Sequence, residues 1–277
     1  MKNLIIMASL ILASSADASS FTFESVNLPY PAGRMVVNAW IDGHELKCVL
    51  DTGGRKSVLK SNSFFAGYSS IGEGGISGIT DGEIQADTIN VIDVKFGSLN
   101  LKNHSFLRTA SLPFDCIIGN DILSHGPFVL DMPKRKFEFD IPLDLTDTSL
   151  LNVYSGLWFG FNIKLGENKY ASLWDTGAPL TIVDPVVVNK DSKNFDVLEE
   201  IEIADATGTR KKAKLINIRS LDFADVTLKN IMAVSYSLDR IKREVPEVDI
   251  VVGYNVIRLC NWHIDPLNKS WRAFPNK

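Results

Sequence analysis

The sequence predicts an all-β protein built from two homologous halves. Three observations lead to this prediction. Short alternating apolar runs, separated by Gly, Asn and Pro turns, recur along the chain. Helical patterns are scarce, and only residues 119–123 and 253–257 are expected to open short helices. A long stretch of the first half also recurs in the second. The halves are expected at residues 20–142 and 151–277, joined by a polar linker at residues 143–150.

Each half begins with a predicted β-hairpin that ends in an aspartate. VNAWIDGHELKCVLD (37–51) aligns without a gap with FNIKLGENKYASLWD (161–175). One Asp-Thr-Gly tripeptide is an ordinary polar turn. A duplication explains two copies, but it does not explain why a charged residue is retained in two apolar settings. The two tripeptides are Asp51-Thr52-Gly53 and Asp175-Thr176-Gly177.

The repeat continues downstream of these turns. Residues 87–107 and 215–234 each read as a long hairpin joined at a polar turn. A short apolar strand ending in glycine follows in each half, at Ile117-Ile118-Gly119 and at Val251-Val252-Gly253. Twelve residues after each glycine, Asp131 or Asp265 opens a basic turn before an aromatic-bearing strand.

Asp-Thr-Gly followed later by two apolar residues and Gly resembles the aspartic proteases of the pepsin and retropepsin type. The resemblance covers about residues 36–274, and this chain carries the whole set twice. It implies two retropepsin-like β-barrel lobes related by pseudo-twofold symmetry, with the active site between them. Gly54 departs from the pattern, because retropepsins usually have Ala or Ser there; the second copy has the usual Ala178.

The resemblance implies a catalytic pair, Asp51 and Asp175. Two carboxylates held about 3 Å apart share one proton. The charged member can act as general base on a water, and the protonated member can donate to the scissile carbonyl. No metal or organic cofactor is required. The implied supporting residues are Thr52 and Thr176 tying the loops together, Gly53 and Gly177 allowing close approach, the hydroxyls of Ser57 and Thr181, and Gly119 and Gly253 on the supporting strands.

A flap over the substrate is expected between the Asp loop and the glycine strand. Residues 71–82 are rich in glycine and suit a thin, mobile tip, with Gly74, Gly75 and Ile76 facing the substrate. An ordinary Gly-rich loop is the alternative. The matching segment 203–214 has far less glycine, so it is expected to form a stiffer hairpin.

The three cysteines are compatible with either one disulfide or three free thiols. In the fold that the resemblance implies, the strands carrying Cys48 and Cys116 run side by side, which favours a disulfide in an oxidising compartment and leaves Cys260 free. The alternative is three buried thiols that act as small hydrophobes. The four histidines lack zinc-protease spacing, and no Gly-x-Ser-x-Gly element is present.

The N-terminus, residues 1–18, reads as a signal peptide. Lys2 precedes an apolar run at residues 4–13, and Ala16-Asp17-Ala18 fits a cleavage site. The run of about 10 residues is too short to cross a membrane, which needs about 20. We therefore expect a soluble, exported bacterial protein, periplasmic or secreted, with no membrane span after cleavage. A net charge of −4 argues against a nucleic-acid partner.

The function expected from these features is an aspartic endopeptidase that hydrolyses protein or peptide substrates. The alternative is a noncatalytic protein of the same fold that binds peptides or cell-wall material. The presence of both aspartates favours the enzyme. The protein is expected to be a monomer, because the linker tethers the two halves at high effective concentration.

Overall fold

The computed structural model describes residues 20–139 and 147–276. The predicted signal peptide at residues 1–18 and the first part of the predicted linker lie outside these ranges. The end of that linker is not an irregular segment. Ser149–Leu150 forms strand β12, which pairs with β23 (Ser270–Pro275).

The first half folds into a ring of six strands. The strand order β3-β4-β9-β5-β8-β7 is closed by pairing of Trp40 with Lys95 and of Ile41 with Val94. Strands β2 and β6 extend the sheet at its ends. The bounds are β2 (Glu24–Asn27), β3 (Gly33–Ile41), β4 (His44–Leu50), β5 (Val58–Lys60), β6 (Ser70–Ser77), β7 (Glu83–Phe96), β8 (Leu99–Thr109) and β9 (Cys116–Ile118).

The second half contains a ring with the corresponding strand order. The order β15-β16-β21-β17-β20-β19 is closed where Lys164 pairs with Asp222, and β18 extends it as β6 extends the first ring. The two long predicted hairpins are present as β7–β8 and β19–β20. The bounds are β15 (Asn162–Leu165), β16 (Asn168–Trp174), β17 (Thr181–Val183), β18 (Phe195–Ala204), β19 (Arg210–Phe223), β20 (Val226–Ser235) and β21 (Val248–Val252).

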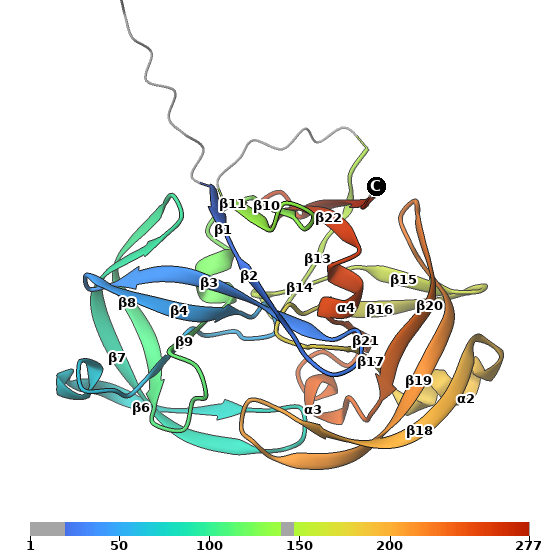
Figure 1. The fold of residues 1–277 in the computed structure, drawn as a ribbon, viewed down its shortest axis with the longest axis horizontal. Coiled ribbons are helices and arrows are strands. Elements are labelled where there is room, and N and C mark those ends of the chain that lie inside the picture. Colours follow the sequence, from blue (N-terminus) through green and yellow to red (C-terminus); the bar gives the residue numbers. More distant parts are fainter. Residues whose placement is uncertain (1–19, 140–146, 277) are drawn as a thin grey trace, which may run out of the picture.

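A third sheet draws strands from both halves and lies across the top of the view in Figure 1. Its order is β1-β11-β10-β22-β23-β12, and β10 meets β22 where Phe128 faces Ile264. A separate small hairpin, β13–β14, leads into the second ring. The bounds are β1 (Ser20–Thr22), β10 (Phe128–Asp131), β11 (Lys136–Phe139), β13 (Asn152–Tyr154), β14 (Trp158–Gly160) and β22 (Cys260–Asp265).

Helices are short. The two expected after the glycines are present as α1 (Asn120–Leu123) and α4 (Tyr254–Ile257). Sequence reasoning missed α2 (Pro185–Lys190), although Asp184 caps it by accepting from the Val186 N–H and proline occupies its first turn. The remaining helical turns are α3 (Asp239–Lys242), η1 (Phe65–Gly67) and η2 (Ser192–Asn194).

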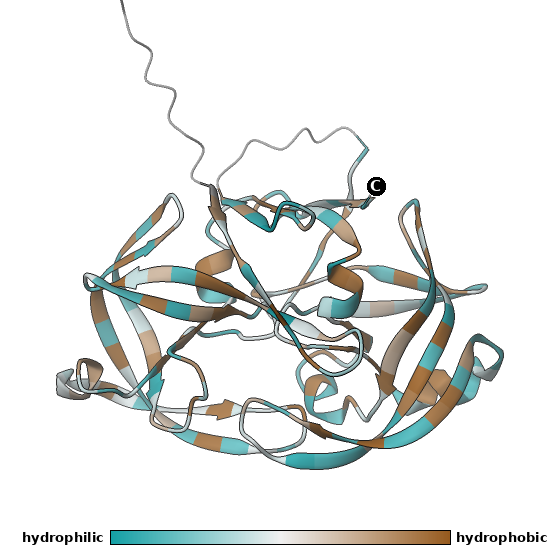
Figure 2. Cartoon of the chain, in the orientation of Figure 1, coloured by the Kyte–Doolittle hydropathy of each residue, from teal (hydrophilic) through white to brown (hydrophobic). Residues whose placement is uncertain are grey.

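The core follows from the period-two pattern of the strands. Along β3, Met35, Val37, Ala39 and Ile41 are buried, while the residues between them face outward. Apolar and polar residues alternate in the same way along the long strands in Figure 2. One large buried cluster includes residues of both rings and of the third sheet, so the apolar interior is continuous between the halves. Among the described residues, no helix has the length and apolar character needed to cross a membrane.

Candidate active site

The two Asp-Thr-Gly turns follow the ends of equivalent strands. β4 ends at Leu50, and β16 ends at Trp174, so an aspartate comes directly after a buried apolar strand in each ring. The Asp51 N–H donates to the Ile118 carbonyl at 3.0 Å, and the Asp175 N–H donates to the Val252 carbonyl at 2.9 Å. Each loop is therefore anchored to the apolar strand that precedes a glycine.

Two buried threonines join the loops. The Thr52 hydroxyl donates to the Trp174 carbonyl at 2.8 Å and accepts from the Thr176 N–H at 3.0 Å. The Thr176 hydroxyl donates to the Leu50 carbonyl at 2.8 Å and accepts from the Thr52 N–H at 3.1 Å. Both side chains are fully buried, so each hydroxyl satisfies groups of the opposite loop that water does not reach. This reciprocal arrangement fixes the two loops relative to each other.

The two carboxyl groups converge on one backbone amide. The Gly53 N–H lies 2.9 Å from Asp51 Oδ1 and 3.1 Å from Asp175 Oδ1. Asp51 Oδ1 also accepts from the Gly54 N–H at 3.0 Å. Asp175 Oδ1 accepts from the N–H groups of Gly177 and Ala178 at 2.8 and 3.1 Å. Backbone amides thus hold the two carboxyls facing each other across the junction of the halves.

The surroundings of Asp51 and Asp175 give the two carboxyl groups different pKa values. Burial, and to a lesser extent the Asp51 charge, raises the pKa of Asp175 to about 8. Burial also raises the pKa of Asp51. Opposing effects come from the hydrogen bond with Asp175, from the amides of Gly54 and Gly53, and from the positive charge of Arg34. Asp51 is therefore the carboxyl that ionises first, and Asp175 is the one that retains the shared proton.

Conformational stability should fall as pH rises through the range in which Asp175 keeps its proton. The ordinary value is 3.8, and the folded value is about 8. Between them the native state binds a proton that the unfolded chain has lost, which gives a slope of up to about −1.4 kcal/mol per pH unit. The loss is complete above about pH 8. Urea unfolding at a series of pH values measures this slope, and Asp175→Asn should flatten it. An unchanged slope in that variant would contradict the assignment.

Glycine is required where each loop faces the opposite carboxyl. A Cβ on Gly53 would lie 2.4 Å from Asp175 Oδ2, and a Cβ on Gly177 would lie 2.4 Å from Asp51 Cγ and Oδ1. Real Cβ atoms do not approach other atoms this closely, so any side chain would push the carboxyls apart. Gly54 differs, because its Cβ would first meet Asp51 atoms at 3.4 to 3.5 Å.

The glycines after the apolar strands also lie under the loops. A Cβ on Gly119 would meet the Gly54 carbonyl oxygen at 2.8 Å. A Cβ on Gly253 would meet the Leu180 backbone at 2.5 Å. The hydroxyls of Ser57 and Thr181 accept from the N–H groups of Gly119 and Gly253, at 3.0 and 3.2 Å. These four residues therefore connect the loops to the strands behind them.

Sequence reasoning did not find the acceptors of those hydroxyls. Asp121 Oδ1 accepts from the N–H and the hydroxyl of Ser57, at 2.9 and 2.7 Å. Asn255 Oδ1 accepts from the same two groups of Thr181, at 2.7 and 3.0 Å. Each acceptor stands two residues after its glycine, and this spacing is the signal that could have identified the pair. The first half therefore uses a carboxylate where the second uses an amide.

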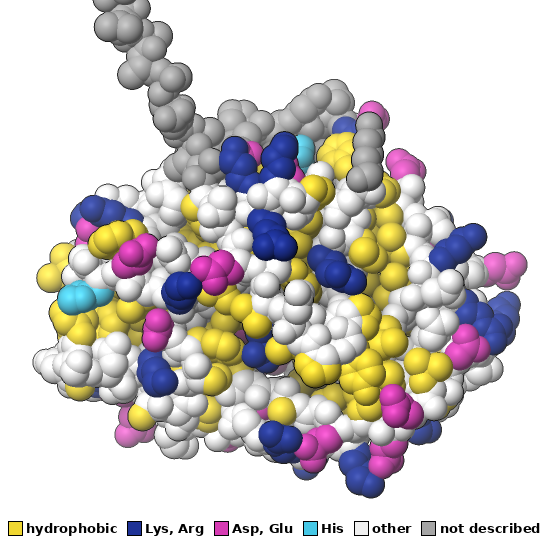
Figure 3. All heavy atoms as spheres, in the orientation of Figure 1, with side chains coloured by type: hydrophobic (Ala, Val, Ile, Leu, Met, Phe, Trp, Pro, Cys, Tyr) yellow, Lys and Arg dark blue, Asp and Glu magenta, His cyan; other side chains and the backbone are white. Residues whose placement is uncertain are grey.

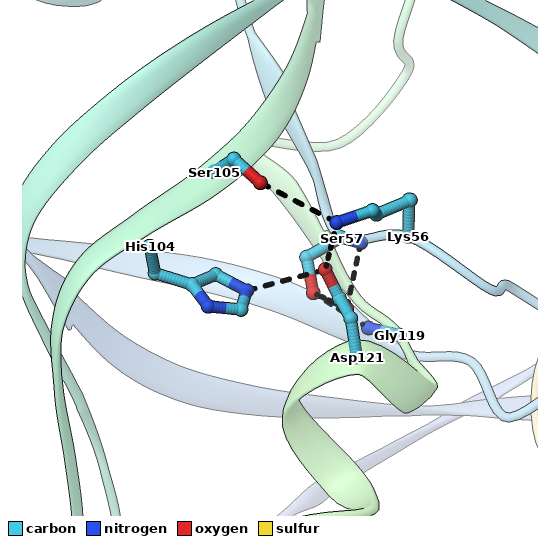
Figure 4. Close-up of polar contacts among 6 residues, drawn as sticks. All are labelled: Lys56, Ser57, His104, Ser105, Gly119 and Asp121. Atoms are coloured by element: carbon cyan, nitrogen blue, oxygen red, sulfur yellow. Dashed lines mark hydrogen bonds and ion pairs between the residues drawn. The ribbon is translucent and has the colours of Figure 1, made fainter. Parts of the chain in front are cut away.

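Asp121 has further polar neighbours that Asn255 lacks. His104 Nε2 lies 3.2 Å from Asp121 Oδ2, and Lys56 Nζ lies 3.9 Å from the same oxygen (Figure 4). Lys56 also reaches the Ser105 hydroxyl at 3.3 Å. The Asp121 side chain is only 7% exposed, so these contacts stabilise a carboxylate that has little access to water.

Two substitutions at Asp121 should show whether its hydrogen-bond acceptance or its negative charge contributes more to stability. Asp121→Leu leaves both Ser57 donors without an acceptor, and we expect a loss of about 3 kcal/mol in unfolding free energy. Asp121→Asn keeps an oxygen acceptor for Ser57, the same amide oxygen that Asn255 provides in the second half, so we expect a loss of about 1 kcal/mol or less in unfolding free energy. Denaturant unfolding measures both, with Asn255→Leu as the matched change in the second half. Equal losses for Asp121→Leu and Asp121→Asn would contradict this account.

The tips of two hairpins, one from each half, contact each other. Asp205, at the β18–β19 turn, accepts from the N–H of Thr80 at 3.0 Å and from its hydroxyl at 2.5 Å. Thr80 lies in the β6–β7 turn, and the two hairpins converge at the bottom of Figure 1. Arg240 of α3 also binds Ser77 and Glu83 of the first hairpin. The face in Figure 3 is hollowed near its centre, and apolar side chains gather around the hollow.

The flap prediction needs correction in detail. Gly74, Gly75 and Ile76 do not form the tip, because they pair with Ala86, Gln85 and Ile84 within a regular hairpin. The turn lies at residues 78–82, where the Gly78 N–H donates to the Gly82 carbonyl at 2.9 Å. Glycine is needed at the tip for contact with the other hairpin. A Cβ on Gly78 would lie 1.6 Å from Asp205 Oδ2, and a Cβ on Gly82 would lie 1.9 Å from the Thr207 hydroxyl.

Asp205→Ala should release the joined tips. Burial raises the pKa of Asp205, but hydrogen bonds from Thr207 and Thr80 outweigh burial and lower it below the ordinary value. The contact is therefore present above the ordinary pKa and is lost as pH falls through the lower folded value. We expect faster amide exchange at residues 78–82 in Asp205→Ala, with at most about 2 kcal/mol lost in global stability. Lys211→Ala, at an exposed position on the β18–β19 hairpin, is the control. Unchanged exchange in Asp205→Ala would refute the contact.

Cys48 and Cys116 are joined by a disulfide between β4 and β9, with their Cα atoms 4.5 Å apart. Both residues are fully buried, directly behind the Asp51 loop. Cys260 is free and buried, and burial raises the pKa of its thiol to about 12. The bond ties the strand leading to Asp51 to the strand that supports it.

Within the described ranges, no group of three or more His, Cys, Asp or Glu side chains is arranged to hold a metal ion. Comparison of the chain with protein-family models and with curated proteins gives no match. The site geometry therefore carries the functional argument.

Proposed function

We propose that this protein is an aspartic endopeptidase of the pepsin and retropepsin type. The observation that carries the proposal is the meeting of two Asp-Thr-Gly loops, in which Asp51 and Asp175 share the Gly53 amide. The matching strand orders of the two rings support a single-chain protein with two lobes related by a pseudo-twofold axis. The lobes would meet at the dyad and share the third sheet.

The different pKa values of Asp51 and Asp175 support one acting as general base and the other as general acid. Asp51, the carboxylate, takes a proton from a water whose oxygen attacks the scissile carbonyl carbon. Asp175, the acid, donates its proton to the carbonyl oxygen, and a tetrahedral diol results. Asp51 then passes its proton to the amide nitrogen while the C–N bond breaks, and a diol proton returns to Asp175. The oxygens of the carbonyl and the water end in the product carboxyl group, and the three protons of the water and Asp175 end on that carboxyl group, on the amine and on Asp175, so no cofactor enters the cycle.

The apolar surroundings of the dyad support a peptide substrate. Four side chains form a first apolar wall around a buried cluster that includes Val49, two residues before Asp51. A second wall surrounds the cluster next to the Asp175 loop. Apolar walls beside few polar groups are typical of sites that bind peptide side chains. The first wall is Val36, Ile76, Leu107 and Phe114, and the second is Ile79, Trp158, Ile182 and Ile241.

We further propose export to the bacterial periplasm or medium, and a monomeric active species. The Cys48–Cys116 disulfide supports an oxidising compartment. The presence of both dyad loops in one chain supports an active monomer, because no second copy is needed to complete the pair.

Digestion of a peptide library between pH 4 and pH 8, followed by mass spectrometry, tests the proposal. We expect internal cleavage that pepstatin, an inhibitor of pepsin-type enzymes, suppresses. Loss of the same cleavages in Asp51→Asn would exclude a contaminating protease. A folded protein that binds library peptides and cleaves none would refute the endopeptidase and support the noncatalytic alternative.

A further inference from the structure

Arg34 is a cation whose guanidinium forms no ion-pair contact and donates no hydrogen bond within the described ranges. It lies on β3 and is half-buried, with its guanidinium carbon 5.2 Å from the centroid of the Phe114 ring. Among residues 20–139 and 147–276, no carboxylate lies within ion-pair distance of it and no N–H of its guanidinium donates a hydrogen bond; the charge of Asp51 acts on it without such a contact. By contrast, Arg55 pairs with Glu244, and Arg108 pairs with Asp87. A half-buried guanidinium normally finds such a partner, so Arg34 has unused binding capacity.

Arg34 lies beside the catalytic pair. Phe114, on which it stacks, belongs to the first apolar wall, together with Ile76 of the β6–β7 hairpin. Asp51 is near enough for its charge to raise the pKa of Arg34, although burial has the larger effect and lowers that pKa overall. A peptide that crosses the dyad and contacts this wall would therefore place a side chain within reach of the guanidinium.

The second half has no equivalent cation. Arg34 lies 17 residues before Asp51, and the residue 17 before Asp175 is Trp158. The Trp158 indole N–H donates to the Gly53 carbonyl at 2.8 Å, and the Arg55 guanidinium lies over its ring. The two sides of the dyad therefore offer different chemistry, a guanidinium without hydrogen bonds on one and a hydrogen-bonded aromatic on the other. A substrate should show the same asymmetry.

We propose that Arg34 binds a carboxylate of the substrate, the side chain of an Asp or Glu residue on one side of the cleaved bond. This inference rests on the proposed endopeptidase function and adds a substrate class to it. Phe114 covers one face of the guanidinium, and the N–H groups at its edge remain available for two parallel hydrogen bonds to a carboxylate. Removal of that cation from water contact makes such a pair stronger than one at an exposed surface.

The dyad chemistry is compatible with an ionised substrate side chain. Asp175 keeps its proton up to about pH 8, so the one-proton state of the dyad extends into the neutral range. Asp and Glu side chains in a flexible peptide ionise near pH 4. The enzyme can therefore be active at a pH at which the proposed carboxylate is charged.

Matched peptides that carry Glu or Gln at each position around the cleaved bond test the proposal at pH 6.5. We expect one position at which Glu raises kcat/KM over Gln by about 10- to 100-fold. Arg34→Met should abolish that ratio, Arg34→Lys should retain part of it, and Arg34→Glu should favour Lys over Glu at the same position. Arg219→Met, at an exposed ion pair with Asp196, is the control and should keep the wild-type ratio.

The Glu-to-Gln ratio separates recognition from an effect on the dyad. The charge of Arg34 lowers the pKa of Asp51, so Arg34→Met can alter the rate with every peptide. That effect cancels in the ratio. Equal loss for Glu and Gln peptides, in a variant whose thermal unfolding matches the wild type, would overturn the proposal. Absence of any Glu preference in the wild type would do the same.

Binding to an inactive variant distinguishes failure of this inference from failure of the proposed function. Asp51→Asn and the double variant Asp51→Asn, Arg34→Met are titrated with fluorescent Glu and Gln peptides. Tighter binding of the Glu peptide that disappears in the double variant supports the carboxylate site even if the wild type cleaves nothing. Equal affinities for both peptides in Asp51→Asn refute it even if the wild type proves to be a peptidase.

Discussion

Asp51→Asn is expected to lower kcat for peptide cleavage by at least about 10³-fold while the protein stays folded. The amide cannot take a proton from water, so the general base is lost. Its Oδ1 can still accept from the amides of Gly53 and Gly54, which hold the loop in the native structure. Removal of one of two facing acidic groups also relieves the repulsion that arises once both carboxyls ionise, above about pH 8. Steady-state kinetics and thermal unfolding measure the two effects separately.

Asp175→Asn should be equally inactive, because the pair acts as a unit. Losses in such a unit are not additive, so the double variant should be little slower than either single variant. Asp225→Asn, at an exposed turn, is the control and should keep full activity. Near wild-type turnover by purified Asp51→Asn would eliminate the dyad mechanism.

Gly53→Ala is expected to lower kcat/KM by at least about 100-fold, and Gly54→Ala by no more than a few-fold. The new methyl at residue 53 would lie 2.4 Å from the Asp175 carboxylate, so the two loops must separate. A displacement of about 1 Å in a catalytic constellation costs about 10²-fold. The methyl at residue 54 would lie 3.4 Å or more from its neighbours, which is an ordinary van der Waals distance.

These neighbouring substitutions form a matched pair, since each adds one methyl to the same turn. The second half already carries Ala178 at the position equivalent to Gly54. Both kinetic constants should be measured beside unfolding free energies, because Gly53→Ala also separates the Thr52–Thr176 contacts. If Gly54→Ala were the more damaging of the two, the close approach described for the loops would be wrong.

The sequence alone was enough to predict the two Asp-Thr-Gly turns, their supporting glycine strands and the hairpins that lead into them. These features have local signals. Period-two apolar alternation defines the strands, and an aspartate after a buried apolar run, as at Leu50 and Trp174, stands out because charges are costly there. The repeat added a second copy of every signal, so each half supported the reading of the other.

The hairpin tips show where local signals were insufficient. Glycine content suggested a thin tip around Gly74 and Gly75, but these residues lie in a paired strand. The tip is determined by the contact between Thr80 and Asp205, which are 125 residues apart. Composition indicates which residues permit a turn, and it does not specify which segment will meet the turn in space.

Only the tertiary structure decided which side chains complete the site. Asp121 and Asn255 were read as parts of short helices, and their role as acceptors depends on loops more than 60 residues away. Arg34 was one charged residue on a strand until the fold placed it on Phe114, near Asp51 but without an ion-pair contact. The physical reason is that hydrogen bonds and ion pairs act over a few ångströms, whereas sequence patterns report only which residues are neighbours along the chain.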